Sequence, residues 1–406
     1  MKLTKKQARQ FILAHQSLLP PYSLKNKSDI LKFIKKVGCI QFDPLDKVGY
    51  NPHLVLQSRV NNYKTDFLRE LLYDKRELID GWDKNMSIYA VDDWPYFSRH
   101  RQQAYQQHKN KSKLIEEVIP EVKNIIDKKG PCSSIDLDFD TKIDWSWAPT
   151  RAARAALEAM YSWGELIIHH KVGTRKVYDF TDQHLPTNIL ETSDPNQTQE
   201  DYYSWYVKRR IGSVGMLWSL SGGAWLGIDG LKKKERTRAL AQLRKQGEII
   251  EVKVEDIRHP FYIRREESDL LKNVVKGITF KPEVSFVAPL DNILWDRKLI
   301  KRIFDFEYVW EVYKPSEERK YGYYVLPVLY GDKFVGRFEP DFDKETKELI
   351  IKNWWWEDKA DNSLEFKNAL INCIKQFANY LGADSIKLKT NIRILQGLSL
   401  SKLRTG

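Results

Sequence analysis

The sequence predicts a mixed α+β fold in which tandem helical modules, each closed by a β-hairpin, are followed by a β-rich C-terminal region. The first observation is length, because 406 residues exceed what one hydrophobic core usually serves. The second is a pattern of helices and a hairpin that occurs between 112 and 182 and again between 202 and 264. The third is a change to strand-like segments after Gly277. These observations predict several domains.

The first module is expected over 1–110. A helix begins after the capping residue Thr4 and continues to Leu18, and a second runs from Ser28 to Gly38, a residue that commonly ends helices. The apolar-polar segment that follows is broken by Pro44, so it can form only a brief strand or turn. Further helices and short strand-like pieces are expected over 52–60, 65–73, 77–82 and 87–91.

The second and third modules, expected over 111–200 and 201–276, repeat the order helix, short helix, helix and hairpin. That order is typical of a winged-helix domain. The second module has its elements at 115–129, 133–137, 150–164 and 165–180. The third has its elements at 202–212, 215–221, 232–246 and 248–264. The first module fits the same plan less regularly, which predicts three related modules in tandem.

The region 277–406 is expected to be α+β. A tight turn at Gly331-Asp332 and a longer, charged hairpin tip at Lys314–Gly322 would connect its strands, and a helix over 364–381 would close it. The strands are expected over 284–287, 308–313, 323–329, 333–339 and 348–356.

The charge of the chain favours a polyanionic partner. The net charge is +12, and the segment from Ser204 to Arg265 holds 14 Lys and Arg against 6 Asp and Glu. A solvated helix face is the alternative for this segment. For phosphate contact we select five residues of one predicted helix: Lys232, Lys233, Lys234, Arg236 and Arg238. Arg319 and Lys320 of the charged tip could also contact DNA, or could belong to an ordinary turn.

Several classes of protein lack support in the sequence. No apolar stretch approaches the roughly 18 residues of a membrane span, and the N-terminus does not resemble a secretory signal, so a cytoplasmic protein without membrane contact is expected. The three cysteines lie far apart, and His169 and His170 should point to opposite faces of a strand, so no metal is expected. The dinucleotide, P-loop, GxSxG and HExxH motifs are absent, and no cofactor, nucleotide cofactors included, is expected.

One short segment has the composition of a catalytic pair. Period-2 alternation places Gln41 and Asp43 on one face and Phe42 on the other, so Phe42 could anchor the loop while the polar side chains face a cleft. A carboxylate beside a carboxamide could orient and polarise a water. The alternative is that Asp43 only caps the turn at Pro44. Winged helices and a basic patch would by themselves favour a transcription regulator without enzymatic activity.

The chain resembles the YcaQ-type winged-helix DNA glycosylases, a family related to AlkZ. The resemblance rests on motifs that occur in order from Gly38 to Pro327 and so spans most of the chain. They are Gly38–Pro44 with His53–Leu56 and Ser58-Arg59, Gly164–Leu166 with Val177–Asp179, Ala288–Asn292 with Trp295–Arg297, and Tyr321–Pro327.

The resemblance implies tandem winged-helix modules that form a concave DNA-binding channel, and double-stranded DNA carrying alkylated or crosslinked purines as the partner. It implies excision of alkylated purines and the unhooking of interstrand crosslinks, with Gln41 and Asp43 as the catalytic pair. The aspartate form of the pair resembles the broader YcaQ branch more than the AlkZ branch tied to one natural product. Nucleoid association through DNA would follow.

The expected chemistry needs few groups. A guanine alkylated at N7 is cationic and leaves as a neutral base, so the enzyme chiefly stabilises an oxocarbenium-like sugar and places a water. We assign the first task to Asp43 and the positioning of the water to Gln41, without a lysine nucleophile, which predicts a monofunctional glycosylase. Three further residues have alternative roles: His53 near a phosphate or simply exposed, and Asp291 and Asn292 as loop supports, DNA contacts or a helix cap.

Overall fold

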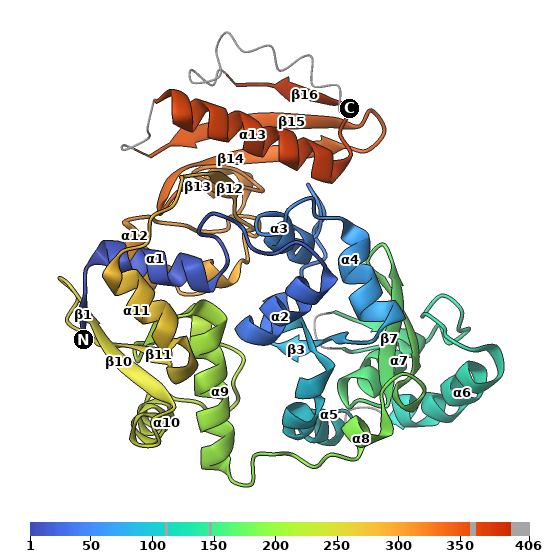
Figure 1. Ribbon diagram of the computed structural model, residues 1–406. Helices are drawn as coiled ribbons and strands as arrows, with labels where there is room; N and C mark the ends of the chain where they lie inside the picture. Colours follow the sequence, from blue (N-terminus) through green and yellow to red (C-terminus); the bar gives the residue numbers. More distant parts are fainter. Residues whose placement is uncertain (110–112, 146–147, 358–362, 391–406) are drawn as a thin grey trace. The chain divides into compact units, whose positions relative to one another are not determined.

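The computed structural model describes residues 1–109, 113–145, 148–357 and 363–390 (Figure 1). The chain forms two compact units. The larger comprises Met1–Leu68, Trp82–Ile88 and Gln199–Gly406, and the smaller comprises Arg69–Gly81 and Tyr89–Thr198. Helices and several sheets occur along the chain, which confirms the mixed architecture.

The larger unit opens with the two predicted helices, α1 (Lys5–His15) and α2 (Lys27–Val37). Thr4 caps α1 in a capping box with Gln7, and Asn26 caps α2. Gly38 ends α2 at a φ of 82°, a conformation that favours glycine. The predictions of both helices are confirmed. Capping residues next to each helix determine where it begins, and this information is local in the sequence.

The polar pair follows directly. Strand β2 (Cys39–Gln41) ends at Gln41, and the Phe42 amide donates to the Met86 carbonyl at 2.8 Å. Helix α3 (Asn51–Gln57) comes next, and then α4 (Thr65–Arg69), which continues as a π-helical turn, Glu70–Asp74. Strands β3 (Leu78–Asp83) and β4 (Asn85–Ala90) complete a sheet of order β2-β4-β3.

The basic segment contains α9 (Gln199–Val214), α10 (Lys233–Lys245), β10 (Ile249–Val254) and β11 (Phe261–Arg264), and α11 (Ser268–Lys276) follows it. Strand β1 (Lys2–Leu3) joins β10 in a sheet of order β1-β10-β11-β9.

The helix predicted over 215–221 is wrong. The middle of this segment is strand β9 (Leu217–Trp218). Trp218 pairs with Phe261 across the sheet, and the two rings stack with centroids 5.3 Å apart. A short apolar run does not distinguish a helix from a buried strand, and the tertiary pairing decides.

The C-terminal sheet has the order β12-β13-β14-β15-β16. Its strands are Val284–Phe286, Leu326–Tyr330, Lys333–Asp343, Glu348–Trp356 and Ser385–Leu388. Helix α13 (Leu364–Leu381) lies along this sheet (Figure 1), and Phe377 meets Phe286 edge to face at 5.4 Å. Helix α12 (Arg297–Phe304) precedes β13. The turn at Gly331 is confirmed, with a φ of 58°.

The strand predicted over 308–313 is wrong, and Lys314–Gly322 is therefore not a hairpin tip. The segment is irregular and contains one 3-10 turn, Ser316–Glu318. Tyr308 is buried and donates from its hydroxyl to the Val325 carbonyl at 2.7 Å. Side-chain packing, and not a strand ladder, holds this segment.

The smaller unit contains α5 (Ser98–Lys109), α6 (Lys113–Lys129), α7 (Ala152–Ser162) and α8 (Thr187–Leu190). Its sheets are the short pair β5 (Lys142–Ile143) and β6 (Thr150–Arg151), and the predicted hairpin of β7 (Leu166–Val172) and β8 (Arg175–Phe180). The core lies where α6 and α7 pack against the hairpin.

The short helix predicted over 133–137 is wrong. The Asp136 carboxylate accepts hydrogen bonds at 2.7 Å from both the backbone amide and the hydroxyl of Ser133. Such local bonds compete with helix formation and produce a turn. Within the described residues, no helix is long and apolar enough to cross a membrane.

Candidate active site

Gln41 is held at the end of β2 and is only 5% exposed. Its backbone carbonyl accepts a hydrogen bond from the Asn51 side chain at 2.7 Å, and its side-chain Oε1 lies 3.4 Å from the Lys84 ammonium. Asn51 is the first residue of α3, so this hydrogen bond ties the start of α3 to the end of β2.

Asp43 lies two residues after Gln41 and is partly buried. Its Oδ1 accepts a hydrogen bond from the Leu45 amide at 2.9 Å. Asp43 therefore caps the turn at Pro44, as the alternative interpretation of the sequence predicts. Burial raises the pKa of Asp43 above its usual value, and the bond from Leu45 opposes that rise. The cap engages one carboxylate oxygen only, so capping and a role towards substrate are compatible.

The expected alternation is altered at Phe42. Gln41 is buried, whereas Phe42 is partly exposed and packs against Tyr50 with ring centroids 5.8 Å apart. The prediction that Phe42 anchors the loop in the core while Gln41 and Asp43 both face a cleft is therefore wrong in its assignment of faces, since Gln41 is the most buried of the three. The strand ends at Gln41, and strict alternation no longer applies beyond it.

An ion-pair network fixes the start of β2. Arg209 of α9 donates to the Gly38 carbonyl at 2.9 Å and to the Asp83 carboxylate at 2.7 Å. Arg210 lies 2.6 Å from the other oxygen of Asp83. Burial alone would raise the pKa of Asp83, but Arg210 and Arg209 outweigh it and lower the pKa to about 2. The carboxylate therefore stays ionised and keeps α9 attached to the motif.

Lys84 belongs to the site although sequence reasoning missed it. It lies between β3 and β4, is 8% exposed, and its ammonium sits 5.0 Å from the ring centroid of Trp295. Burial is the main reason that its pKa falls to about 8. Its position between two predicted strands was the available signal, but the pairing of β2 with β4 was needed to bring it to Gln41.

The three residues with alternative roles, His53, Asp291 and Asn292, all contact other residues of the protein. Asp291 is fully buried, forms two hydrogen bonds with Arg59 at 2.8 and 2.7 Å, and also caps the turn at Ile293. Asn292 is equally buried and donates to the Cys39 carbonyl of β2 at 2.9 Å. His53 Nδ1 lies 2.8 Å from the Tyr63 hydroxyl. Burial favours support of the motif over DNA contact for Asp291 and Asn292.

The basic residues selected from the sequence divide into two groups. Lys232, Lys233, Lys234 and Arg238 are exposed at or near the start of α10. Arg236 is buried and donates to the Ser219 carbonyl at 2.9 Å, so its guanidinium is not presented to a phosphate. In the irregular segment after 313, Lys320 is exposed, while partly exposed Arg319 donates to the Lys314 carbonyl and lies over Tyr323.

One protein family, described as DNA glycosylase AlkZ-like, has a profile that matches residues 34–380. The match includes β2, the basic helix α10 and most of the C-terminal sheet. The chain belongs to the AlkZ-like DNA glycosylase family. It is thus a DNA glycosylase, an enzyme whose substrate is DNA, and the resemblance inferred from the motifs is confirmed.

The fold of this glycosylase is similar to that of a solved structure, the Streptomyces sahachiroi DNA glycosylase AlkZ. The TM-score is 0.62, and the similarity covers 96% of this chain and 99% of that chain at 13% sequence identity. At this identity the likeness concerns the fold, and it supports the mixed architecture over almost the whole chain.

Proposed function

We propose that this glycosylase hydrolyses the N-glycosidic bond of N7-alkylguanine in double-stranded DNA and unhooks interstrand crosslinks joined through that nitrogen. The observation that carries the proposal is the arrangement at the end of β2, where a buried glutamine precedes a half-buried aspartate. Asp43 is partly desolvated and keeps one oxygen outside its cap, while Gln41 is fixed from two sides.

The reaction follows from the charge of the substrate. The alkylated base departs as a neutral molecule, and positive charge grows on the sugar, where a carboxylate in a partly dry site stabilises it. Asp43 supplies that charge and polarises the attacking water, and Gln41 orients the same water. Leaving-group protonation is not required, so no general acid is needed. Because water, and not a lysine amine, attacks the sugar, the product is an abasic site and the enzyme is monofunctional.

An exposed aromatic side chain lies in the electrostatic neighbourhood of Asp43. Tyr313 is 82% exposed, and its pKa is raised, first by partial desolvation and then by the negative charge of Asp43. Nucleobases stack readily on exposed aromatic rings. Tyr313 is a candidate to contact the damaged base or its neighbour, which would suit bulky adducts better than a closed pocket.

The finer architecture belongs to the same proposal. Helices α9 and α10 with the hairpin β10–β11 support a winged-helix module over 201–276, and α6, α7 and the hairpin β7–β8 support another over 111–200. The proposed architecture also has a module over 1–110, an α+β region over 277–406 and a concave DNA-binding channel. Lys232, Lys233, Lys234 and Arg238 would hold phosphates.

Two substrates test the proposal. The full chain is incubated with duplex DNA containing N7-methylguanine and, separately, with a nitrogen-mustard crosslink. Abasic sites revealed by heat or alkali, and separated strands from the crosslink, are the expected results. A protein that only retards the DNA in a gel, without forming abasic sites, would refute the assignment and favour a regulator.

Excision is expected to persist in excess EDTA, because a cationic leaving group needs no Lewis acid. The assay is repeated after chelation, with Mg²⁺ and Zn²⁺ added back in parallel. Activity that disappears with EDTA and returns with one ion would contradict hydrolysis by the Gln41–Asp43 pair alone.

A further inference from the structure

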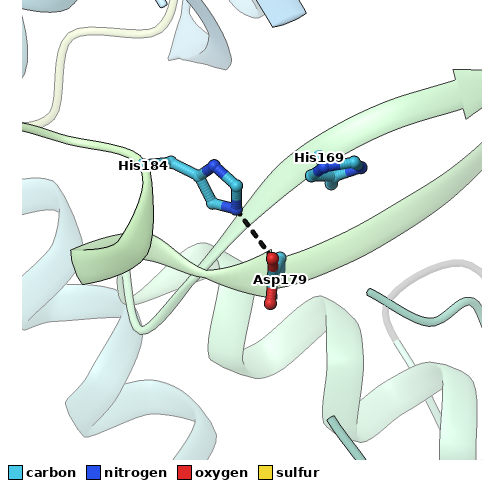
Figure 2. Close-up of side chains that lie close together, drawn as sticks. All are labelled: His169, Asp179 and His184. Carbon is cyan, nitrogen blue, oxygen red and sulfur yellow. Dashed lines mark hydrogen bonds and ion pairs between the residues drawn. The ribbon is translucent and has the colours of Figure 1, made fainter. Parts of the chain in front are cut away.

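Three potential metal ligands lie close together at one hairpin of the smaller unit (Figure 2). They are His169 of β7, Asp179 of β8 and His184, which follows a 3-10 turn at Thr181–Gln183. One ligand atom from each lies within 4.8 Å of the others. His184 Nε2 is 2.7 Å from Asp179 Oδ2, the contact drawn as a dashed line.

A β-bulge determines where His169 points. Ile168 pairs with Tyr178 and His170 with Val177, so His169 is the extra residue between them. Arg76 donates hydrogen bonds of 2.9 Å to the carbonyls of Ile168 and His169, which fixes the bulge. The opposite orientations expected for His169 and His170 are not observed, because their Nδ1 atoms lie 2.7 Å apart.

The carboxylate is also held in place. The Asp179 side chain is 7% exposed, and its Oδ1 accepts a hydrogen bond from the Phe180 amide at 2.9 Å. Its Oδ2 therefore faces His184, whose side chain is 18% exposed. The cluster combines a largely buried carboxylate with a histidine that solvent can reach, so an ion could enter without unfolding the hairpin.

We propose that His169, Asp179 and His184 bind one Zn²⁺ ion per chain, with water as the remaining ligand. Two imidazole nitrogens and one carboxylate oxygen form a donor set that zinc accepts at about 2.0–2.2 Å, which places ligand atoms about 3.3 Å apart in a tetrahedral site. His184 Nε2 and Asp179 Oδ2 are closer than that, at 2.7 Å, and all three ligand atoms lie within 4.8 Å of one another. Small side-chain rotations are sufficient, and the metal replaces the hydrogen bond between His184 and Asp179.

The surroundings supply further features of a metal site. The contact between Nδ1 of His169 and Nδ1 of His170 orients the first ring and leaves its Nε2 for the ion. Ligating histidines commonly have the second ring nitrogen held by a hydrogen bond, although the usual partner is a carboxylate, a carbonyl or water. Arg76 is a cation close to His169, so its charge opposes the binding of a metal cation there. Asp80 is paired with Lys171, so the carboxylate left to offset the added charge is Asp179 itself. We expect the metal to stabilise the hairpin and to take no part in excision.

The test uses the full chain after chelation and dialysis. Zn²⁺ is titrated by calorimetry, and Co²⁺ is titrated by visible absorption as a probe of coordination. One saturable site per chain and intense four-coordinate Co²⁺ bands are expected. Asp179→Asn, His169→Asn and His184→Asn should each weaken binding by about tenfold or more, since each removes one ligand of three.

Two matched controls complete the design. Asp182→Asn removes an exposed carboxylate from the same turn, and His259→Asn removes an exposed histidine of the larger unit. Both should bind zinc like the wild type. Equal affinities of Asp179→Asn and Asp182→Asn, or wild-type protein without a saturable site, would overturn the proposal. Should one ligand variant fail to fold, the other two and the wild-type Co²⁺ spectrum still decide.

Discussion

Lys84 carries an ammonium group into the interior of the larger unit, next to Gln41. Its Nζ lies 3.4 Å from Gln41 Oε1 and close to the Trp295 ring, and burial lowers its pKa to about 8. A protonated Lys84 donates a hydrogen bond to the Gln41 side-chain oxygen. The NH₂ group of Gln41 must then point away from Lys84. We infer that Lys84 is a positioning residue for the glutamine that orients the water.

The rate of excision should therefore depend on pH at two points. Asp43 acts as a carboxylate, and its raised pKa moves the rise in rate to a higher pH than for an exposed aspartate. Lys84 is charged below about pH 8 and loses its proton above it, so the rate should fall as the pH passes about 8. In Lys84→Met the alkaline fall should disappear, measured under single-turnover conditions.

Lys344→Met is the matched control, because Lys344 is an exposed lysine that pairs with Asp46 at 2.6 Å. Its pH profile should equal that of the wild type. The role of Lys84 would be refuted by an unchanged alkaline fall in Lys84→Met.

Single residues were predictable where the chemistry is local. Gln41 and Asp43 stand out from their neighbours by residue type and spacing, and the cap by Asp43 follows from Pro44 in the sequence. Lys84 and the cluster of His169, Asp179 and His184 depend on strand pairing and on a bulge. No local spacing encodes those features, so the sequence alone could not identify them.

At the scale of elements, a buried ion pair joins two distant segments of the site. Arg59 follows α3, and Asp291 precedes the turn that leads into α12; both side chains are fully buried. Removing one partner of such a pair leaves a buried charge without compensation, which costs about 3–5 kcal/mol. Asp291→Asn keeps the shape of the cap but loses the charge, so denaturant unfolding should show a loss of this size.

Asp305→Asn provides the comparison on the surface. Asp305 is 62% exposed and lies 3.9 Å from Lys5. Exposed pairs contribute at most about 1 kcal/mol, so this variant should unfold almost like the wild type. A loss in Asp291→Asn no greater than that in Asp305→Asn would show that the buried pair does not hold the two segments together.

The predictions of helices and strands were correct where the signals lie within the element itself, and wrong where distant contacts decide the structure. Helices α1, α2 and α13 have caps and apolar spacing in their own residues, and all three are found. The expectations at 133–137, 215–221 and 308–313 are wrong because a side-chain turn, a strand partner and aromatic packing override local pattern. The predicted domain boundaries remain predictions.

At the scale of the whole molecule, the net charge is +12, and the segment from Ser204 to Arg265 holds 14 Lys and Arg against 6 Asp and Glu. Lys232, Lys233 and Lys234 are exposed at the N-terminal end of α10. Replacing all three with Ala should weaken binding to damaged and undamaged duplex alike. It should also flatten the salt dependence by about one unit of log–log slope per lost contact.

Fluorescence anisotropy at several salt concentrations measures this slope. Replacing Lys272, an exposed lysine of α11 paired with Asp269, with Ala serves as the control and should leave the slope close to that of the wild type. An unchanged slope in the triple variant would mean that the lysines form a solvated face. The DNA path would then lie elsewhere, with the segment that contains Arg319 and Lys320 as the next candidate.

The central claim is that Asp43 and Gln41 perform base excision, and the single-turnover rate on N7-methylguanine DNA tests it most directly. Asp43→Asn and Gln41→Ala should each reduce that rate by roughly 10²-fold or more with DNA affinity within a few fold, because these groups act on the transition state. Asp46→Asn, three residues away, should excise like the wild type. Near-wild-type excision by both Asp43→Asn and Gln41→Ala would contradict the account.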